Sequence, residues 1–317
     1  MRILHVVAKK KGFEVNPSVH AQIESLKKIL DIDVFVYEAS SLVNYLHALY
    51  FLHHRIKYQN YDLIHAHFSR SALLSLLACY NKIPVIVSYM GTDLLGKNQL
   101  NVWIKRFVTK KVSYQIVKSK EMITYLPPSK SISVIPNGVC FERFHPIKME
   151  EARKQLGLEN DIVYFLFPGS PHRKEKNFPL AEKAVNLAQK YLGKKIELLT
   201  IYNETHERVN LFMNACDIVL LTSTYEGSPN VIKEALACNC RIVSTNVGDV
   251  KERLEGVKGC FLAEPNPEDF AKKTLKGLTA CKKTNGREKI KELNIAFIAE
   301  RIKKLYHSIA MDKNKPS

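Results

Sequence analysis

The stretch from Ala215 to Leu236 reads ACDIVLLTSTYEGSPNVIKEAL, in which an apolar run passes through a short polar loop into a helix-like run. The run from Ile218 to Leu221 is continuously apolar, as a strand covered on both faces should be, and the predicted strand ends at Thr222. Ser228 is a good helix N-cap and Pro229 suits a first helical position, so a helix is predicted to begin there. A helix that starts just after a buried strand directs its first-turn amides and its positive dipole end at the strand's end, which predicts an anion site.

Two carboxylates flank this predicted anion site. Glu226 lies in the loop, and Glu234 lies about one turn into the helix. A carboxylate accepts hydrogen bonds from two adjacent hydroxyls, so each acid suits a sugar diol. A ligand with a diphosphate at the helix end, a ribose on one side and a hexose on the other would use all of these groups. Taken on physics alone, the two acids fit equally well as surface residues stabilised by the helix dipole.

Strand-like and helix-like stretches alternate along the whole chain. Strict alternation predicts parallel sheets with helices on both faces, so we expect an α/β protein of two Rossmann-like domains facing a cleft. The predicted strands are residues 3–8, 33–37, 63–67, 85–89, 114–118 and 133–136, then 163–167, 196–201, 218–222, 241–245 and 259–262. The predicted helices include 17–30, which Asn16 can cap, and 179–191, 207–216, 230–238, 267–278 and 295–307.

Proline and glycine punctuate the chain between the two halves, at Pro136, Gly138 and Pro146. We therefore expect an N-terminal acceptor-side domain over residues 1–142 and a donor domain over residues 143–294. A C-terminal helix and tail, residues 295–317, would follow and could cross back to the first domain.

Composition narrows the class of protein further. The 317 residues suggest two domains, and no apolar run approaches the roughly 20 residues of a membrane span. Seven cysteines without a CxxC pair, and a start too short for a secretory signal, predict a cytoplasmic protein with reduced thiols. The net charge of +17 favours polyanionic partners, but the basic residues form no Arg-rich arm, so nucleic acid is not expected.

Residues 226–235 resemble the Glu-Gly-x-Pro-Asn-Val-x-x-Glu-Ala signature of retaining glycosyltransferases of family 4, which have the GT-B fold. Other segments resemble that family in the same order. They are IHAHF at 64–68, SYMGTDL at 88–94, VIPNGV at 134–139, FPG at 167–169 with Lys176-Asn177, and TNVGDV at 245–250. The resemblance spans nearly the whole chain. It implies transfer of a hexose, with retention, from a nucleotide-sugar donor to a saccharide or lipid-linked acceptor in cell-surface polysaccharide or glycolipid synthesis, with no metal or other cofactor.

The resemblance also implies roles for individual residues. Glu234 should hold the donor ribose diol, Glu226 should hold the donor sugar near its 3- and 4-hydroxyls, and Lys176 should neutralise the departing diphosphate. The backbone of the donor site should include Gly169, Gly227, Ser228, Asn230, Val231 and Ile232. Gly12 should let the first loop approach the donor phosphate or the acceptor.

The phosphate-binding loop departs from the family pattern. Relatives carry an arginine directly after the glycine equivalent to Gly169, and Ser170 stands there in this chain. The nearest arginine is Arg173, whose guanidinium could serve the phosphates from a shifted position. The alternative is a solvated basic loop over residues 172–176.

His65 and His67 face the same side of one predicted strand, and the family places the second of such a pair on the acceptor side, which favours His67. Metal binding is not expected there because a third ligand is missing. Met90 stands where many relatives carry a histidine before a glycine, so that histidine's role does not transfer. Asp93, at the next strand's end, is a candidate for binding the acceptor hydroxyl, or else a helix N-cap.

Other patterns keep alternatives open. Residues 31–33 read as a DxD metal motif but introduce a strand, and neither half has the GxGxxG of a dehydrogenase. A sugar-nucleotide epimerase or a phosphorylase of the same fold is one alternative, and a non-enzymatic basic protein that binds membrane or nucleic acid is another. Residues 42–57 and 102–111 mix aromatic and basic side chains at helical spacing, which predicts either peripheral contact with an anionic membrane or a domain-packing face.

Overall fold

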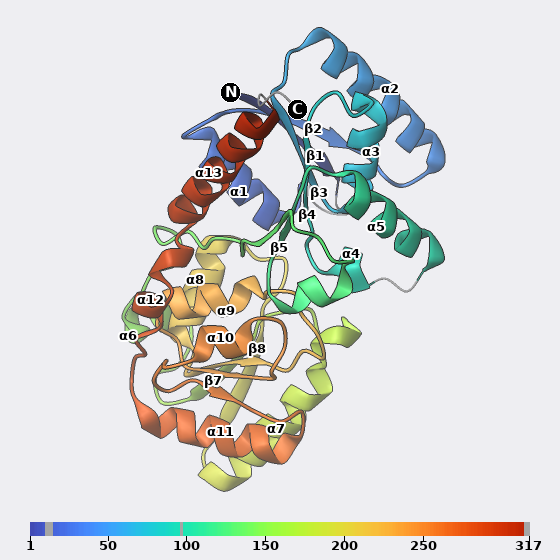
Figure 1. Cartoon of the computed structure of the whole chain (residues 1–317). Coiled ribbons are helices and arrows are strands. Elements are labelled where there is room, and N and C mark those ends of the chain that lie inside the picture. Colours follow the sequence, from blue (N-terminus) through green and yellow to red (C-terminus); the bar gives the residue numbers. More distant parts are fainter. Residues whose placement is uncertain (10–14, 96–97, 314–317) are drawn as a thin grey trace. The chain divides into compact units, whose positions relative to one another are not determined.

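The computed structural model describes residues 1–9, 15–95 and 98–313, and the chain divides into two compact units. The first unit joins Met1–Gly138 to the C-terminal segment Ile295–Ser317, and the second spans Val139–Asn294. Each unit is one parallel sheet with helices on both faces (Figure 1). The predicted α/β class with two parallel-sheet units is therefore confirmed. Gly12 lies outside the described residues.

Six parallel strands in the order β2-β1-β3-β4-β5-β6 form the sheet of the first unit. Their bounds are β1 (Arg2–Ala8), β2 (Asp31–Tyr37), β3 (Leu63–His67), β4 (Val85–Ser88), β5 (Tyr114–Val117) and β6 (Ile132–Val134). Every one of these was predicted, because a strand buried on both faces is a short, continuous apolar run. The strand order reverses between β1 and β3, and such a switch point opens a crevice at the carboxyl ends of the strands.

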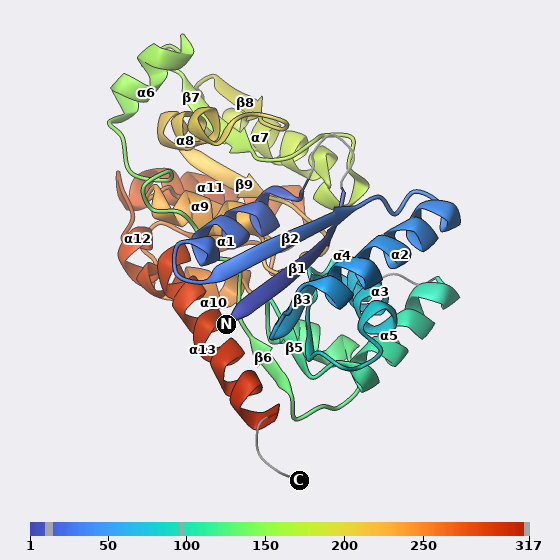
Figure 2. The same ribbon diagram turned by 90° about the horizontal axis from the view of Figure 1, so that it is seen from above.

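Two helical layers sandwich this sheet (Figures 1 and 2). One layer holds α2 (Leu42–Tyr58), α3 (Ser69–Cys79) and α5 (Gln99–Lys111), with the short α4 (Thr92–Leu95) and the 3₁₀ turn η1 (Glu121–Tyr125) nearby. The opposite layer holds α1 (Pro17–Lys27) and α13 (Ile295–Lys313), which pack against each other. Leu4 and Val6 of β1 belong to the apolar core beneath α2 and α3, whereas His5, between them, contacts Tyr306 of α13. Because neighbouring residues of β1 face opposite sides of the sheet, His5 lies on the side of α13, and Leu4 and Val6 lie on the side of α2 and α3.

Five parallel strands in the order β11-β10-β9-β7-β8 form the second sheet. Their bounds are β7 (Val163–Phe167), β8 (Ile196–Thr200), β9 (Ile218–Leu221), β10 (Ile242–Ser244) and β11 (Phe261–Leu262). The helices α7 (Phe178–Leu192) and α11 (Pro267–Ala280) pack together over one face. The remaining elements are α6 (Met149–Leu156), η2 (Lys174–Lys176), α8 (His206–Ala215), α9 (Asn230–Ala237), α10 (Val250–Leu254), α12 (Gly286–Lys289) and η3 (Lys291–Leu293).

Helix starts follow local capping chemistry in several places. The side chain of Asn16 accepts a hydrogen bond from the Ser18 amide at 3.1 Å, as predicted for the cap of α1, and Pro17 takes the first position. Ser41 caps α2 through the Asn44 amide at 3.1 Å. In the described part of the chain, no helix is both long and apolar enough to cross a membrane.

Candidate functional site

Two of the predicted site residues meet at the strand ends of the second unit. Lys176 donates a hydrogen bond from Nζ to Oε1 of Glu226 at 2.6 Å, and Ser223 Oγ donates to the same oxygen at 3.0 Å. The two ionic side chains are 12% and 20% exposed, so the pair sits at the boundary between protein and solvent. The sequence separates these residues by fifty positions, and the adjacent strands β7 and β9 bring them together.

Local backbone structure fixes Lys176. The Lys176 carbonyl accepts a hydrogen bond from Thr222 Oγ1, at the end of β9, at 2.8 Å. Asn177 follows in the left-handed region, with φ of +51°, and turns the chain into α7. The Lys176 side chain runs over Gly169, where an added Cβ would lie 3.5 Å from its Cδ. The predicted neighbourhood of Gly169 and Lys176 is therefore present in the structure.

Glu234, on the first part of α9, is the carboxylate without a partner in this site. It is half-buried, and among the described residues its side-chain oxygens have no hydrogen bond or ion pair. Burial raises the pKa of Glu234 to about 7, against the opposing effect of the nearby cations Lys233, Arg143 and Lys176. An ionisable acceptor that is desolvated and unoccupied carries a free-energy cost that a ligand with paired donors relieves.

The loop before α9 packs tightly on the loop after β10. Gly248 has φ of +57°, and an added Cβ there would lie 2.6 Å from the Gly227 carbonyl oxygen and 2.8 Å from that of Glu226. Only glycine fits both the backbone conformation and this close approach. The contact holds the backbone around Glu226 and Gly227 in place.

The predicted start of α9 was wrong by one residue. Pro229 is the N-cap and Asn230 begins the helix, and Ser228 makes no capping hydrogen bond. Ser228 Oγ instead donates to Asp249 Oδ2 at 2.9 Å and accepts from Lys233 Nζ at 3.1 Å. The hydroxyl of Ser228 therefore bonds to the buried charged side chains of Asp249 and Lys233 and does not cap the helix.

First-turn amides of α9 have no partners within the helix, as at any α-helix start. The predicted anion site at this end of β9 thus keeps its geometric basis at Val231 and in the helix dipole. Ile232 differs, because its amide donates to the Pro229 carbonyl at 3.3 Å and its side chain is fully buried.

Arg173 lies in the predicted loop but has a partner of its own. Its guanidinium forms an ion pair with Glu175, with Nε donating to Oε1 at 2.7 Å, and the side chain is 53% exposed. A single rotation about the side chain would release it, since exposed pairs are worth about 0–1 kcal/mol. The structure thus places Arg173 at the rim and Lys176 inside the site.

Sequence reasoning missed three charged residues around Ser228 and Glu234. Lys233 is buried, and burial lowers its pKa to about 8. Asp249 is buried, accepts from Ser228 and Arg253, and has one oxygen, Oδ1, with no hydrogen-bond partner. Arg143 is exposed and close enough to lower the pKa of Glu234. Lys233 lies within the segment 226–235 and Asp249 within the TNVGDV segment, but neither motif assigned a role to these residues.

The predicted histidines form a buried network in the first unit. His65 and His67 do face one side of β3, and the pairing of β1 with β3 places His5 beside His65. His5 Nδ1 lies 3.0 Å from His67 Nε2, and Tyr306 Oη lies 3.2 Å from His5 Nε2 and also contacts His65. All three rings are fully buried, and burial lowers the pKa of each, that of His5 to about 3. They are therefore neutral at physiological pH.

His5 is the third histidine that the sequence analysis did not find. One nitrogen of each ring lies within 4.8 Å of the others, so ligand number no longer argues against a metal at His5, His65 and His67. The existing hydrogen bonds argue against it, because a metal would have to break the bond between His5 and His67 or a bond of His65 to Ser88 or Tyr306. His67 faces this network, and its Nδ1 is buried with no hydrogen-bond partner among the described residues.

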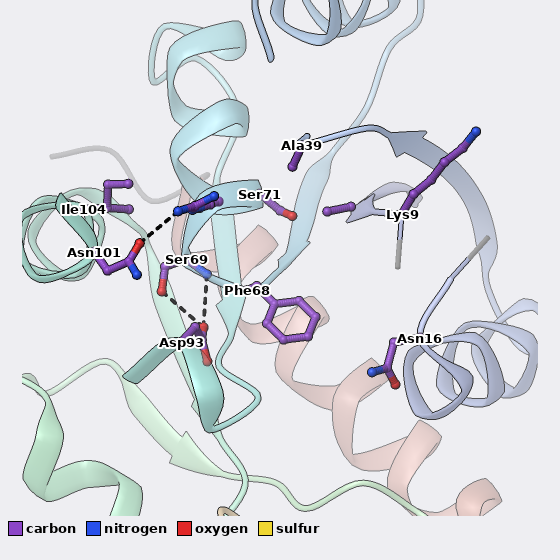
Figure 3. A pocket seen from close by; sticks show the side chains of 11 residues that line it. Lys9, Asn16, Ala39, Phe68, Ser69, Ser71, Asp93, Asn101 and Ile104 are labelled. Atoms are coloured by element: carbon purple, nitrogen blue, oxygen red, sulfur yellow. Dashed lines mark hydrogen bonds between the residues drawn. The ribbon is translucent and has the colours of Figure 1, made fainter. Parts of the chain in front are cut away.

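Asp93 lines a cavity of about 300 Å³ at the switch point of the first sheet (Figure 3). Its Oδ2 accepts from the amide and hydroxyl of Ser69, both at 3.1 Å, and its Oδ1 accepts from the amides of Met90 and Gly91 at 3.0 and 3.2 Å. Asp93 therefore caps α3 rather than its own helix, and these bonds occupy the acceptor capacity a substrate hydroxyl would need. Burial raises the pKa of Asp93.

Phe68 also projects into the cavity (Figure 3). Its φ of +73° is rare for an aromatic residue and turns the chain from β3 into α3. The polar and cationic part of the lining comes from Lys9, Asn16, Arg70 and Asn101, with Arg70 donating to Asn101 at 3.2 Å. The cavity can take a ligand with both apolar and hydrogen-bonding groups.

Family models match the chain in two consecutive segments. The model described as Glycosyltransferase Family 4 matches residues 18–143, and the model described as Glycosyl transferases group 1 matches residues 151–280. The UDP-Gal:alpha-D-GlcNAc-diphosphoundecaprenol alpha-1,3-galactosyltransferase of Escherichia coli is 26% identical over 326 residues, which cover 86% of this chain and 82% of that protein.

Solved structures show the same fold. Sucrose-phosphate synthase from Thermosynechococcus elongatus is similar with a TM-score of 0.81 at 16% identity, over 98% of this chain and 100% of that chain. HepE of Anabaena, solved in complex with UDP and glucose, is similar with a TM-score of 0.74 at 18% identity, over 97% and 100%. The two successive family matches, on two parallel-sheet units of GT-B type, show that this chain belongs to the glycosyltransferases of family 4.

Proposed function

We propose that this glycosyltransferase moves a hexose, with retention of anomeric configuration, from a nucleotide-sugar held by the second unit to a saccharide or lipid-linked acceptor. The observation that carries the proposal is the half-buried, unpartnered carboxylate of Glu234, beside the Lys176–Glu226 pair and the first turn of α9. A ribose diol, a hexose and a diphosphate match these three features in turn.

The diphosphate belongs at the first turn of α9 in this proposal. Amides of Gly227, Ser228 and Val231 and the helix dipole supply partial positive charge there, with Asn230 as the first residue of the helix, and Lys176 supplies a full positive charge. Ile232 adds no free amide in the described structure, so its part is to pack the helix start. Glu226 holds Lys176 until the donor arrives, and then exchanges that contact for sugar hydroxyls.

Bond breaking puts growing negative charge on the leaving diphosphate. Lys176 and the α9 amides are already placed where that charge develops, and such preorganised groups usually give the largest part of catalysis. Arg173 swings from Glu175 to the phosphates when the donor is bound. The acceptor hydroxyl attacks on the face the diphosphate leaves, and a donor phosphate oxygen takes its proton, so the configuration is retained. Charge stabilisation comes from the protein alone in this proposal, without a divalent metal.

The acceptor binds in the cavity of the first unit. Phe68 offers an aromatic surface for a sugar ring, and Asn16, Asn101 and Lys9 offer hydrogen-bonding groups. Asp93 keeps the α3 end of this cavity in shape, and His67 holds the strand end through His5. The Escherichia coli relative is named for a diphosphoundecaprenol-linked acceptor and a UDP-hexose donor, which supports a lipid-linked acceptor and a UDP-hexose here. These substrates fit synthesis of a surface polysaccharide or glycolipid.

Seven free cysteines, five of them buried, support a reducing, cytoplasmic compartment.

A transfer assay tests the proposal. The purified chain is incubated with UDP-, GDP- and ADP-hexoses and a polyprenyl-diphosphate-linked sugar, with and without EDTA, and the product's anomeric configuration is read by NMR. We expect one donor to yield a retained glycoside whether or not EDTA is present. Donor epimerisation or phosphorolysis without glycoside formation would contradict the transfer, an inverted product the stereochemistry, and loss with EDTA the metal-independent charge stabilisation.

A further inference from the structure

The outward surface of the α2–α3–α5 layer is unusually apolar. Ten of the eighteen exposed large hydrophobic side chains in the described part of the chain lie on this layer. They are Leu42, Val43, Leu46, Tyr50, Phe51 and Tyr58 of α2, Leu77 and Tyr80 at the end of α3, and Leu100 and Trp103 of α5. Leu42 is 75% exposed, Phe51 61% and Trp103 56%. Monomeric soluble proteins rarely leave such an apolar surface in water, and we call it the apolar face.

The three helices make the apolar face continuous. In both ribbon views α3 lies between α2 and α5 (Figures 1 and 2). Tyr45 of α2 donates to the Arg70 carbonyl at 3.0 Å, and His53 of α2 lies edge-on to Tyr80, with ring centroids 5.4 Å apart. Trp103 stacks on Phe107 at 5.5 Å along α5. The exposed rings of Tyr80 and Trp103 are thus each packed against a neighbouring ring.

Charge on this layer has a single sign. None of α2, α3 and α5 contains an aspartate or a glutamate, while Lys57, Arg106, Lys110 and Lys111 lie on it. The first unit as a whole carries 23 lysines and arginines against 10 acids, and the second carries 25 against 21. An apolar surface with amphipathic aromatics and cations but no carboxylates matches the interface of an anionic bilayer.

We infer that the apolar face docks this protein on anionic lipid membranes. Tyrosine and tryptophan rings enter the interfacial region, and the lysines and arginines neutralise lipid phosphates. A second copy of the chain is a poorer partner, because two such faces would bring like charges together.

Docking would also place the acceptor cavity next to the lipid. The cavity is lined by Ala39, Arg70 and Asn101, which stand at the N-terminal ends of α2, α3 and α5. A sugar on a lipid carrier could then enter the cavity while its chain stays in the membrane. This last point alone rests on the proposed transfer to a lipid-linked acceptor, and membrane docking stands without it.

The single tryptophan lies in the apolar face, so its emission reports docking directly. The full chain is titrated with phosphatidylcholine vesicles and with vesicles of three parts phosphatidylcholine to one part phosphatidylglycerol, and binding is also measured by flotation. We expect a blue shift and flotation with the anionic vesicles, at least about tenfold weaker binding to the neutral ones, and partial release by 1 M NaCl.

Two double variants of equal charge sharpen the test. Leu46→Glu with Tyr50→Glu places carboxylates in the apolar face, and Tyr191→Glu with Tyr202→Glu places them on exposed aromatics of the second unit. The first variant should lose anionic-vesicle binding at least about tenfold and keep nucleoside-diphosphate binding, and the second should keep both. Equal losses in both variants, no vesicle binding by the wild type, or a dimer that the first variant dissolves would each overturn the inference. Retained vesicle binding without any sugar transfer would contradict the proposed function and leave docking in place.

Discussion

The strand ends of the two units hold polar groups in opposite states. In the second unit Lys176 and Glu226 form an ion pair at the solvent boundary, and the carboxylate of Glu234, with its pKa raised to about 7, has no hydrogen-bond or ion-pair partner among the described residues. In the first unit His5, His65 and His67 are buried and neutral, with His5 hydrogen-bonded to His67 and the hydroxyl of Tyr306 between His5 and His65. The comparison shows two uses of polar groups in a parallel-sheet unit. Charged groups near the strand ends can remain accessible to a charged ligand, or polar groups can be buried and connect the unit's own elements by hydrogen bonds.

The excess positive charge shows the same contrast. Charges in the second unit nearly balance, so the donor binding proposed for its site would depend on local geometry rather than on a general field. The first unit carries the imbalance, much of it on the outer helices away from the buried histidines. The position of each charged side chain should therefore affect donor binding and turnover more than the total charge does. Substitutions that remove equal charges at different positions test this expectation.

Lys176→Ala should have the largest effect. Its charge meets the leaving diphosphate more fully in the transition state than in the ground state, so turnover should fall by about 10²–10³-fold, with a smaller loss of donor affinity. Steady-state kinetics measure both. Lys174→Ala removes an equal charge two residues away and should stay within about threefold of wild type, because exposed charges are screened. A costly Lys174→Ala beside a silent Lys176→Ala would show that the field of the loop, and not the placement of Lys176, carries the effect.

Glu234→Ala should follow. A hydrogen bond to a charged acceptor is worth about 1.5–3 kcal/mol, so affinity for the bare nucleoside diphosphate should drop by one to two orders of magnitude. Calorimetric titration gives the value. Glu226→Ala is the matched control, since the proposal assigns this carboxylate to the sugar and not to the ribose. It should bind the bare nucleotide at least as well as wild type and impair transfer; equal losses in the two variants would remove the separate roles.

The histidine network should make the first unit sensitive to acid. Its histidines have folded pKa values below the unfolded value of about 6.5, so the unfolded chain binds more protons. Their contribution is present above pH 6.5 and is lost as pH falls below it, by about 1.4 kcal/mol per histidine per pH unit. Denaturation followed by Trp103 emission between pH 7 and 5 should show this loss. His67→Gln should reduce the slope by about a third, and His47→Gln, at an exposed site, should leave it unchanged. A flat wild-type profile would refute the neutral network.

Donor binding should depend on pH in the same direction for a different reason. With the pKa of Glu234 raised to about 7, its carboxylate is mostly ionised at pH 8 and mostly protonated at pH 6. If the ionised form binds the ribose, nucleotide-sugar affinity falls about tenfold from pH 8 to pH 6. The isosteric Glu234→Gln variant should show no such trend, and a similar slope in both proteins would assign the effect to another group.

Arg173→Ala should have the smallest effect, a loss of turnover of several-fold, since the side chain starts in an exposed pair with Glu175. Glu175→Ala frees the guanidinium and should match or exceed wild-type turnover. Both are read in the same kinetic assay, and a loss in Arg173→Ala as large as in Lys176→Ala would place Arg173 inside the site.

Local sequence patterns predicted the strands and, to within one residue, the start of α9 because both depend on neighbours in the chain. Lys176 could be predicted beside Gly169 because both lie on the loop after one strand. The hydrogen bond of Ser228 to Asp249 could not be predicted, because Asp249 follows a different strand and lies twenty-one residues further along the chain. His5 was missed for the same reason, because only the pairing of β1 with β3 sets it beside His65.

The apolar face shows a further limit of the sequence. Residues 42–57 and 102–111 read as amphipathic helices, and periodicity alone left open whether their apolar residues packed inside or faced water. The structure shows that α2 buries Ala48 and Leu52 while Leu46 and Tyr50 stay exposed. Burial of each residue depends on the position of the sheet, which the local pattern does not contain.

The central claim is that the second unit holds the nucleotide through Glu234 and the start of α9. A crystal structure of the full chain soaked with a nucleoside diphosphate in the presence of EDTA tests it most directly. The account predicts the ribose diol on the Glu234 carboxylate, the diphosphate against the first-turn amides of α9, and Lys176 turned from Glu226 to a phosphate oxygen. A nucleotide found instead in the first unit's cavity, or one seated at α9 with its ribose away from Glu234, would contradict it.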